Sequence, residues 1–286
     1  MTRSTLPKPA PEAGESWRAR LLRQVPYLGK YVHARRERHQ TMGWQIETLR
    51  RLMVTVAESP VTAAGESLEQ ARREVTALTD SDEYRGLYRS EEMLYWLHIP
   101  GWMGEWAKGK QVRRILDIGA GYGTLSVFAS LLTGAEVFCL DTESHRISEA
   151  LRAKHRLTVA GGNVEQISIP WPGPMDAVVM TEVIEHFNFH PVPTMRKIAE
   201  VLAPGGRLFL STPDAASWGR VAESYASYRD MPLPDPVAPT RDIHIYQFTE
   251  DEIRTVLADS GFVVRRLERA PGRWGFHLDV QAEVPG

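Results

Sequence analysis

Three residues capable of acid–base chemistry stand close together at the end of an apolar run: Glu182, Glu185 and His186. Their spacing of three and four places them on one side of a short helical turn. An imidazole can accept a hydroxyl proton near neutral pH, so His186, paired with Glu185, is the first candidate for a general base. His244 is a further catalytic candidate. By charge and ligand type, the four side chains together could also hold Mg²⁺, Mn²⁺ or Zn²⁺.

A glycine-rich stretch, RRILDIGAGYGTL, is the second place where residue types indicate chemistry. An apolar strand carrying Asp117 runs into Gly119, Gly121 and Gly123 and then into a helix. Such glycines let the backbone turn sharply and approach a ligand beside the positive end of a helix, so we expect a nucleotide-like cofactor. A dinucleotide fingerprint would need Gly or Ala where Thr124 stands, which disfavours NAD.

The elements that must position these residues alternate between strand and helix patterns from Gln111 onward, which is typical of parallel βαβ units. The sequence therefore predicts an α/β fold with a doubly wound, mostly parallel sheet. The last two strands are close enough in sequence to pair antiparallel. Strands are expected over 114–118, 135–141, 156–160, 175–181, 206–212, 262–268 and 276–283, and helices over 122–132, 144–155, 192–202 and 249–260.

The N-terminal part of the chain has a different character. Residues 1–15 are rich in Pro, Ala and Glu and are expected to be a disordered leader. Residues 16–110 read as an α-helical extension or lid, and 111–286 as the main domain. Apolar stripes predict a helix over 41–58 and another from an N-cap at Ser67 to Leu78. Six Tyr and Trp residues between Tyr84 and Trp106 either line a pocket or pack the extension onto the main domain.

Composition narrows the function classes. The chain has 286 residues, 43% of them hydrophobic, which is enough for a full core. Its single cysteine, Cys139, excludes a disulfide framework and suits a reducing cytoplasm. Apolar runs are too short to span a bilayer, and no signal peptide is expected. Residues 1–60 carry eleven Lys or Arg against five Glu. A solvated surface is the simpler interpretation, and contact of the segment 17–39 with a membrane is the alternative.

An ordered series of stretches resembles class I S-adenosylmethionine-dependent methyltransferases, in the broad group that includes ubiquinone-biosynthesis and sugar- or glycan-modifying enzymes. The stretches are RRILDIGAGYGTL, EVFCLDTES, GGNVEQI, PMDAVVMTEVIEHF and VLAPGGRLFLSTP, and they cover about 113–212. The resemblance implies a seven-stranded sheet whose last two strands are antiparallel. It also implies that S-adenosylmethionine binds at the carboxyl ends of the first four strands, where open α/β sheets bind ligands.

The resemblance assigns residues to parts of the cofactor. Asp117 and the glycine loop would face the methionine portion, Asp141 would accept both ribose hydroxyls, and Asn163 and Val164 would flank adenine. The expected cofactor contacts are Asp117, Gly119, Ala120, Gly121, Gly123, Asp141, Thr142, Asn163, Val164, Thr181 and Glu182.

The expected reaction is O-methylation of a sugar, a glycan precursor or another polar small molecule, with His186, Glu185 and His244 as catalytic residues. The segment 218–241 is expected to be a substrate lid. Thr249 and Glu252 form a capping box, so the nearby His244 has a purely structural alternative. The N-terminal extension would form part of the acceptor pocket or a homodimer contact.

Other functions remain open at this stage. A phenolic, secondary-metabolite or lipid-linked acceptor would suit the aromatic residues. The Glu182–His186 set with His244 also resembles the metal site of small-RNA 3′-terminal ribose 2′-O-methyltransferases. The acid-rich main domain, however, lacks the basic groove expected for RNA, so we expect no nucleic-acid partner. The same Glu-x-x-Glu-His set resembles that of many methyltransferases of this group in which these residues cap the strand and line the cofactor pocket, so we expect no resident metal. A dehydrogenase and a non-catalytic binding protein fit the series of stretches less well.

Overall fold

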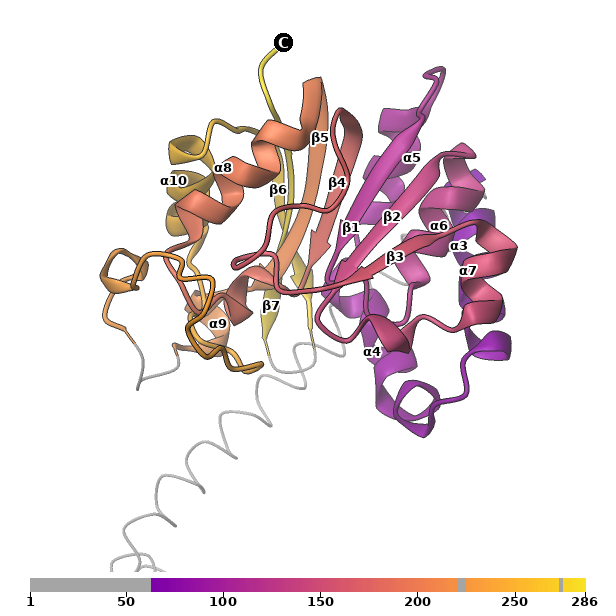
Figure 1. Cartoon of the computed structure of the whole chain (residues 1–286), viewed down its shortest axis with the longest axis horizontal. Helices are drawn as coiled ribbons and strands as arrows, with labels where there is room; N and C mark the ends of the chain where they lie inside the picture. The colour runs from indigo at the N-terminus through magenta and orange to yellow at the C-terminus, as the bar shows by residue number, and fades with distance from the viewer. Residues whose placement is uncertain (1–62, 221–224, 273–274) are drawn as a thin grey trace, which may run out of the picture. The chain divides into compact units, whose positions relative to one another are not determined.

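The computed structural model describes residues 63–220, 225–272 and 275–286, and these contain a seven-stranded sheet with helices on both faces (Figure 1). The predicted leader, the segment 17–39 and the helix expected over 41–58 lie outside the described residues. The strand order is β3-β2-β1-β4-β5-β7-β6. The strands are β1 Arg114–Ile118, β2 Glu136–Asp141, β3 Thr158–Gly161, β4 Met175–Thr181, β5 Leu202–Pro213, β6 Val263–Pro271 and β7 Phe276–Glu283.

The sheet has the predicted pairing. Strands β1 to β5 pair in parallel, and β7 is antiparallel to both β5 and β6. The central strands are consecutive apolar residues because both of their faces are covered. Strand β5 begins at Leu202 instead of 206, because Leu202 pairs with Met175 and the Gly205 N–H donates to the Val284 carbonyl.

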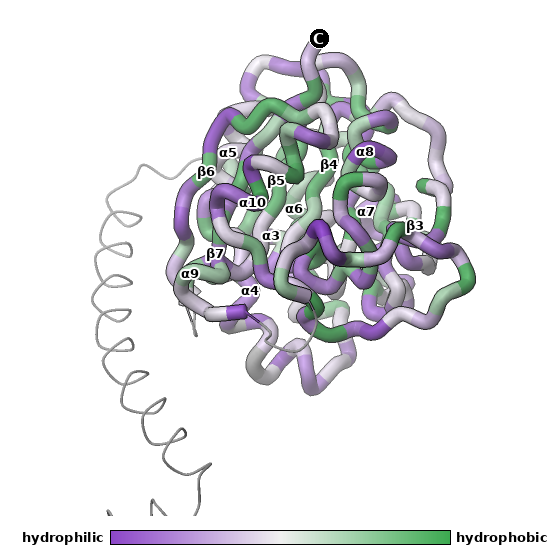
Figure 2. Tube along the Cα trace, turned by 90° about the vertical axis from the view of Figure 1, so that its left-hand side faces the viewer, coloured by the Kyte–Doolittle hydropathy of each residue, from purple (hydrophilic) through white to green (hydrophobic). Residues whose placement is uncertain are grey.

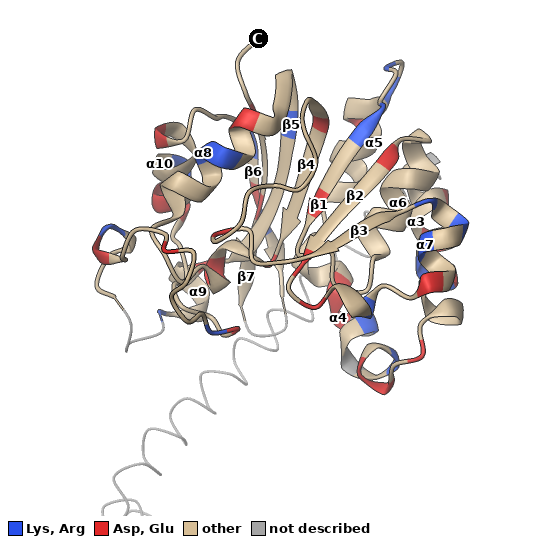
Figure 3. Cartoon of the chain, viewed as in Figure 1, with Lys and Arg blue, Asp and Glu red and all other residues tan. Residues whose placement is uncertain are grey.

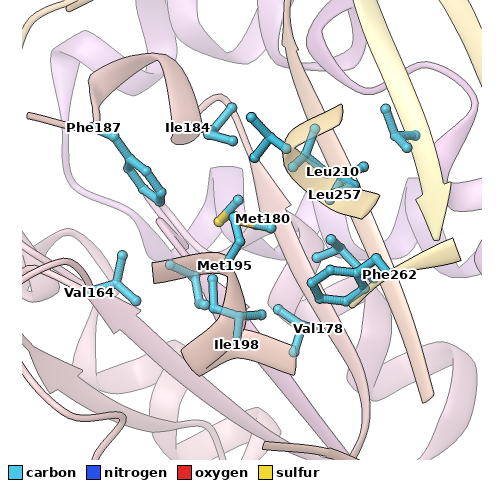
Figure 4. Packing of buried hydrophobic residues seen from close by; sticks show 14 of the residues in the cluster. Val164, Val178, Met180, Ile184, Phe187, Met195, Ile198, Leu210, Leu257 and Phe262 are labelled. Atoms are coloured by element: carbon cyan, nitrogen blue, oxygen red, sulfur yellow. The ribbon is translucent and has the colours of Figure 1, made fainter. Parts of the chain in front are cut away.

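Helices cover both faces of the sheet. On one face, α8 and α10 pack over a hydrophobic cluster that includes Met180, Met195, Ile198 and Phe262 (Figure 4). On the other face, a second cluster joins the sheet to α3, α5, α6 and α7. The central strands β4 and β5 are mostly apolar (Figure 2), and charged residues lie mainly on the outer helices, the connections (Figure 3) and the edge strand β6. The helices are α3 Ala63–Leu78, α4 Arg89–Tyr95, α5 Ile99–Ala107, α6 Thr124–Thr133, α7 Glu149–His155, α8 Pro191–Val201, α9 Ala215–Trp218 and α10 Glu250–Asp259.

The described part of the N-terminal extension belongs to the same compact unit as the sheet. The predicted N-cap at Ser67 is wrong: Ser67 lies inside α3, because the buried stripe of Leu68, Ala71 and Val75 continues one turn earlier to Ala64. Most of the aromatic cluster packs in the core, as Tyr84, Trp96, Trp102 and Trp106 are buried. Among the described residues, no helix has the length and apolarity to cross a bilayer.

A buried polar contact ties the N-terminal helices to the sheet. Asp279 of β7 accepts a hydrogen bond from the backbone N–H of His98 at 2.8 Å, and its Oδ2 lies 2.9 Å from His98 Nδ1. Burial lowers the pKa of His98, but Asp279 more than offsets this and the net shift is upward. His98 immediately precedes α5, so the contact fixes where that helix begins on the sheet.

We expect Asp279→Ala to lower the free energy of unfolding by about 1 to 2 kcal/mol, because the buried His98 N–H loses its acceptor. Urea denaturation followed by circular dichroism measures the change. The matched control is Glu105→Ala, which removes an exposed ion pair with Arg266 and should cost less than about 1 kcal/mol. Equal urea midpoints for the two variants would show that the Asp279 contact does not hold α5.

Candidate active site

A cavity of about 590 Å³ lies at the carboxyl ends of the strands, beside the reversal of strand order between β1 and β4. Open α/β sheets bind ligands at this position, and the volume is within the range of small-molecule sites. The structure brings most of the predicted site residues together here. Those that line the cavity are Gly119, Gly121, Asp141, Thr142, Asn163, Val164, Thr181, Glu182, Glu185, His186 and His244.

Three predicted cofactor residues do not line this cavity. Asp117 is buried behind the glycine loop, where its carboxylate accepts a 2.5 Å hydrogen bond from Ser126 Oγ. Asp117 and Ala120 line a second, much smaller cavity instead. Gly123 is the N-cap of α6 with φ of +86°, a left-handed conformation that favours glycine, so its role in this structure is to let the helix begin.

The other two glycines of the loop bring backbone to the cavity wall. Gly119 has φ of +71°, and a Cβ there would lie 2.2 Å from Val183 Cγ2. Gly121 has φ of +54°, and a Cβ there would lie 3.1 Å from Tyr88 Oη. Both positions therefore favour glycine by conformation, and Gly119 also excludes a larger residue by space.

Asp141, at the end of β2, organises the loop from the other side. Its Oδ2 accepts a hydrogen bond from Gly121 N at 2.8 Å, and its Oδ1 accepts one from Glu143 N at 2.7 Å. Each carboxylate oxygen has a second lone pair. The side chain lines the cavity, so it can accept two further hydrogen bonds from a ligand.

Residues after β3 form the next part of the wall. Asn163 Oδ1 accepts a hydrogen bond from Glu165 N at 2.8 Å. The Glu165 carboxylate in turn accepts from the backbone N–H groups of Asn188 and Phe189, both at 2.9 Å. These bonds join the segment after β3 to the segment after β4. Val164 therefore presents a fixed apolar surface to the cavity.

The predicted helical turn is present as η3 (Ile184–His186), which carries Glu185 and His186. Glu182 precedes it with φ of +55° and is not part of the turn, although it lines the same cavity. The backbone carbonyl of Glu185 accepts hydrogen bonds from Ile245 N at 2.7 Å and Tyr246 N at 3.1 Å.

This backbone clamp brings the two predicted catalytic histidines together. The ring centroids of His186 and His244 are 4.8 Å apart. His186 Nδ1 lies 2.9 Å from Asp242 Oδ1, so one side of the imidazole faces a carboxylate. Burial lowers the pKa of His186, and Asp242 opposes part of that shift. Burial and the neighbouring His186 lower the pKa of His244 to about 4. Both rings are therefore neutral near pH 7, the state in which an imidazole can accept a proton.

Some cavity residues escaped sequence reasoning. His277 of β7 is buried, and its Nδ1 lies 3.0 Å from Glu182 Oε1. Its ring contacts those of Tyr95 and Trp218, with both centroid distances at 5.3 Å. Nothing in the sequence near residue 277 marks it as a site residue, because only the pairing of β7 with β5 brings it to β4.

Three of the four possible metal ligands lie close together. One ligand atom from each of Glu185, His186 and His244 falls within 4.8 Å of the others. Glu185 Oε1 is buried and has no hydrogen-bond partner, while Glu185 Oε2 accepts from Thr212 Oγ1 at 3.1 Å. Glu182 is directed elsewhere, to His277 and to Ser211 Oγ, which donates to it at 2.9 Å. The donor set could accommodate a divalent cation.

Comparison with known protein families identifies the family to which the chain belongs. A family model described as a methyltransferase domain matches residues 95–267, which is more than half of the chain and includes most of the cavity wall. The chain belongs to this methyltransferase family. The ordered series of stretches in the sequence is therefore confirmed as the signature of a class I methyltransferase, whose methyl donor is S-adenosylmethionine.

Individual relatives are more distant. The ubiquinone biosynthesis O-methyltransferase of Xanthomonas campestris pv. campestris is 35% identical over 107 residues, which are 35% of this chain and 42% of that protein. The match thus spans less than half the length of that relative. The crystal structure of a Clostridium acetobutylicum S-adenosylmethionine-dependent methyltransferase covers 71% of this chain and 96% of its own, with a TM-score of 0.50 and 12% identity. It shares the fold of this methyltransferase.

The cavity of this methyltransferase fits its cofactor on two independent observations. Gly119 and Gly121 leave space where a Cβ would intrude on the cavity wall, and Asp141 has acceptor capacity for two hydroxyl groups. Asn163 and Val164 lie one strand further along the same edge. The cofactor would be held by these residues, and the volume beyond them, around His186, is available to an acceptor.

Proposed function

We propose that this methyltransferase methylates a hydroxyl group of a polar small molecule, with a sugar or glycan precursor as the acceptor class. The observation that carries the proposal is a neutral imidazole, His186, that faces Asp242 and lines the same cavity as the residues that fit the cofactor. A hydroxyl has a pKa far above 7, so its methylation benefits from a nearby base.

The catalytic contribution of the chain follows from this geometry. S-adenosylmethionine supplies a methyl group already activated by its sulfonium. Asp141 would accept hydrogen bonds from the ribose hydroxyls, and Asn163 and Val164 would flank adenine, so these residues would hold the reactive centre in place. His186 accepts the acceptor's hydroxyl proton at Nε2, because Nδ1 faces Asp242. The Asp242 carboxylate then stabilises the imidazolium that forms.

The wall around His186 supports a sugar-like acceptor. Tyr95 and Trp218 offer aromatic surfaces, while Arg241 and Glu182 offer polar hydrogen-bonding groups. A sugar ring combines apolar C–H faces with a rim of hydroxyls, and this mixture of side chains complements both. Trp218 and Arg241 stand at the two ends of the predicted lid segment, which supports its role in covering the acceptor.

A second candidate is a metal-dependent methyltransferase that acts on a ribose hydroxyl. The cluster of Glu185, His186 and His244, with the unpartnered Glu185 Oε1, favours it. In that case the imidazoles would bind the cation, and His186 would not serve as the base. The cation would lower the pKa of the hydroxyl directly.

The test is transfer of an isotopically labelled methyl group from S-adenosylmethionine to three acceptor sets: nucleotide sugars with free sugars, catechols, and short RNAs with a free 3′ end. We expect label on a sugar oxygen and no effect of a chelator. Transfer to RNA that is lost in chelator and restored by Mn²⁺ or Mg²⁺ would establish the second candidate instead. Label on catechols alone would overturn the proposed acceptor class while retaining O-methylation.

A further inference from the structure

A second cavity, of about 20 Å³, adjoins the main one on the side of the N-terminal helices. Gly119, Thr181 and Tyr88 line both cavities. The small cavity has room for a single group the size of a water molecule. Two carboxylic acids line it: Asp117 from β1 and Glu92 from α4. Glu92 is outside every stretch that carries the methyltransferase resemblance.

Glu92 is held firmly beside the glycine loop. It is 2% exposed, and its Oε2 accepts a 2.8 Å hydrogen bond from Oγ1 of Thr124, the first residue of α6. Tyr84 Oη donates to Oε1 at 3.4 Å, and Arg72 Nε lies 3.7 Å away. Burial raises the pKa of Glu92 and that of Asp117 to about 7. The ion pair with Arg72 offsets only part of the cost of burying Glu92, so ionising both acids around this water-sized space is favoured by a further cation.

We propose that this cavity receives the α-ammonium group of bound S-adenosylmethionine and that Glu92 is its counter-ion. The inference rests on the proposed function only in taking S-adenosylmethionine as the cofactor. That molecule carries its ammonium group at the end opposite adenosine. Asp141 and Asn163 follow β2 and β3, on one side of β1, and the small cavity lies against Gly119 and Thr181 of β1 and β4. A ligand that extends from the first pair past Gly119 therefore ends at Glu92.

The chemistry of the two partners is complementary. An ammonium group has three N–H donors and approximates a water molecule in size, and charge-assisted bonds to carboxylates are among the stronger hydrogen bonds. Its positive charge would favour the ionised form of both acids. The proposal also gives the N-terminal extension a specific role: α4 completes the cofactor site, and the bond between Glu92 and Thr124 joins α4 to the glycine loop.

The test is isothermal titration of the full chain with S-adenosylhomocysteine and with its analogue in which hydrogen replaces the α-amino group. We expect Glu92→Gln to weaken binding of S-adenosylhomocysteine by about 10- to 100-fold, the range for a charged hydrogen bond. Its affinity for the deaminated analogue should remain that of the wild type. Glu105→Gln, an exposed glutamate on α5, is the matched control and should change neither affinity.

The possible outcomes distinguish the ammonium site from the assignment of S-adenosylmethionine as the cofactor. If the wild type binds no S-adenosylhomocysteine, the cofactor assignment fails. If it binds both ligands equally, or if Glu92→Gln weakens both to the same extent, the cofactor assignment stands and the ammonium site is overturned. Should Glu92→Gln not fold, Asp117→Asn tests the same cavity. It should weaken binding of S-adenosylhomocysteine and leave the affinity for the deaminated analogue unchanged, and an equal loss for both ligands would overturn the ammonium site.

Discussion

Replacing His186 with alanine is expected to lower the turnover number by about 100- to 10,000-fold, the usual contribution of a general base. The imidazole is half-buried, neutral near pH 7 and faces Asp242. His244 is too weak a base for this role, since its pKa is lowered to about 4. Steady-state kinetics with the acceptor found in the transfer assay measure the loss.

Cofactor affinity provides the internal check on this result. His186→Ala should bind S-adenosylhomocysteine as the wild type does, because the loss concerns proton transfer. His145→Ala, an exposed histidine outside the cavity, should keep full activity. A His186 variant that retains the wild-type turnover number would remove the base from the mechanism, and a variant that loses cofactor binding would reassign His186 to the cofactor site.

The pH dependence of activity is a further test of His186, because a purely structural role of this residue would not change it. The pKa of His186 lies below its ordinary value of 6.5, because burial outweighs Asp242. The base must be unprotonated, so activity should rise with pH through a pKa below 6.5 and stay level above it. Asp242→Asn removes the group that raises this pKa. The rise should therefore move to lower pH, with a smaller loss of turnover than in His186→Ala.

Asp141→Ala is expected to weaken binding of S-adenosylmethionine by about 1.5 to 3 kcal/mol, the scale of a lost charged hydrogen-bond acceptor. The structure adds a second reason for a large effect. The same carboxylate accepts the N–H groups of Gly121 and Glu143, so its removal also loosens the glycine loop. Isothermal titration measures the affinity, and circular dichroism checks that the variant is folded.

Two further variants test whether the loss of affinity comes from the Asp141 carboxylate itself. Asp141→Asn keeps one oxygen acceptor and should lose less affinity than Asp141→Ala. Glu136→Ala, at the opposite end of the same strand and exposed, should bind as the wild type does. Unchanged affinity in Asp141→Ala would show that the ribose hydroxyls bind elsewhere.

Local sequence patterns predicted most of the sheet. Strands β1, β4 and β7 have the expected bounds, because each is a run of residues buried on both faces with polar or turn residues at its ends. The capping box of Thr249 and Glu252 begins α10 as expected. The helix expected over 144–155 is instead a short 3₁₀ turn, Ser144–Arg146, followed by α7, because Ser148 provides the actual N-cap.

The candidate site likewise contains some residues that the sequence predicted and some that it did not. The glycine loop and Asp141 were predictable because their positions at strand ends follow from neighbouring residues. Asp242, His277 and Glu92 were not, since each reaches the cavity through contacts with distant parts of the chain. Residue 277 meets residue 182 only because β7 inserts between β5 and β6. No periodicity in the sequence encodes that insertion.

The two hydrogen bonds to the Glu185 carbonyl also hold one end of the segment that lines the acceptor side of the cavity. The segment from Trp218 to His244 is held at one end by the bond from Ala215 N to the Phe248 carbonyl, and at the other by the bonds from Ile245 N and Tyr246 N to Glu185. All three use backbone atoms, which every residue type except proline can supply. Exposed side chains of this segment can therefore change while the backbone bonds that position His186 and His244 are kept. We therefore expect substitutions of these exposed side chains to alter acceptor preference and to leave cofactor binding unchanged.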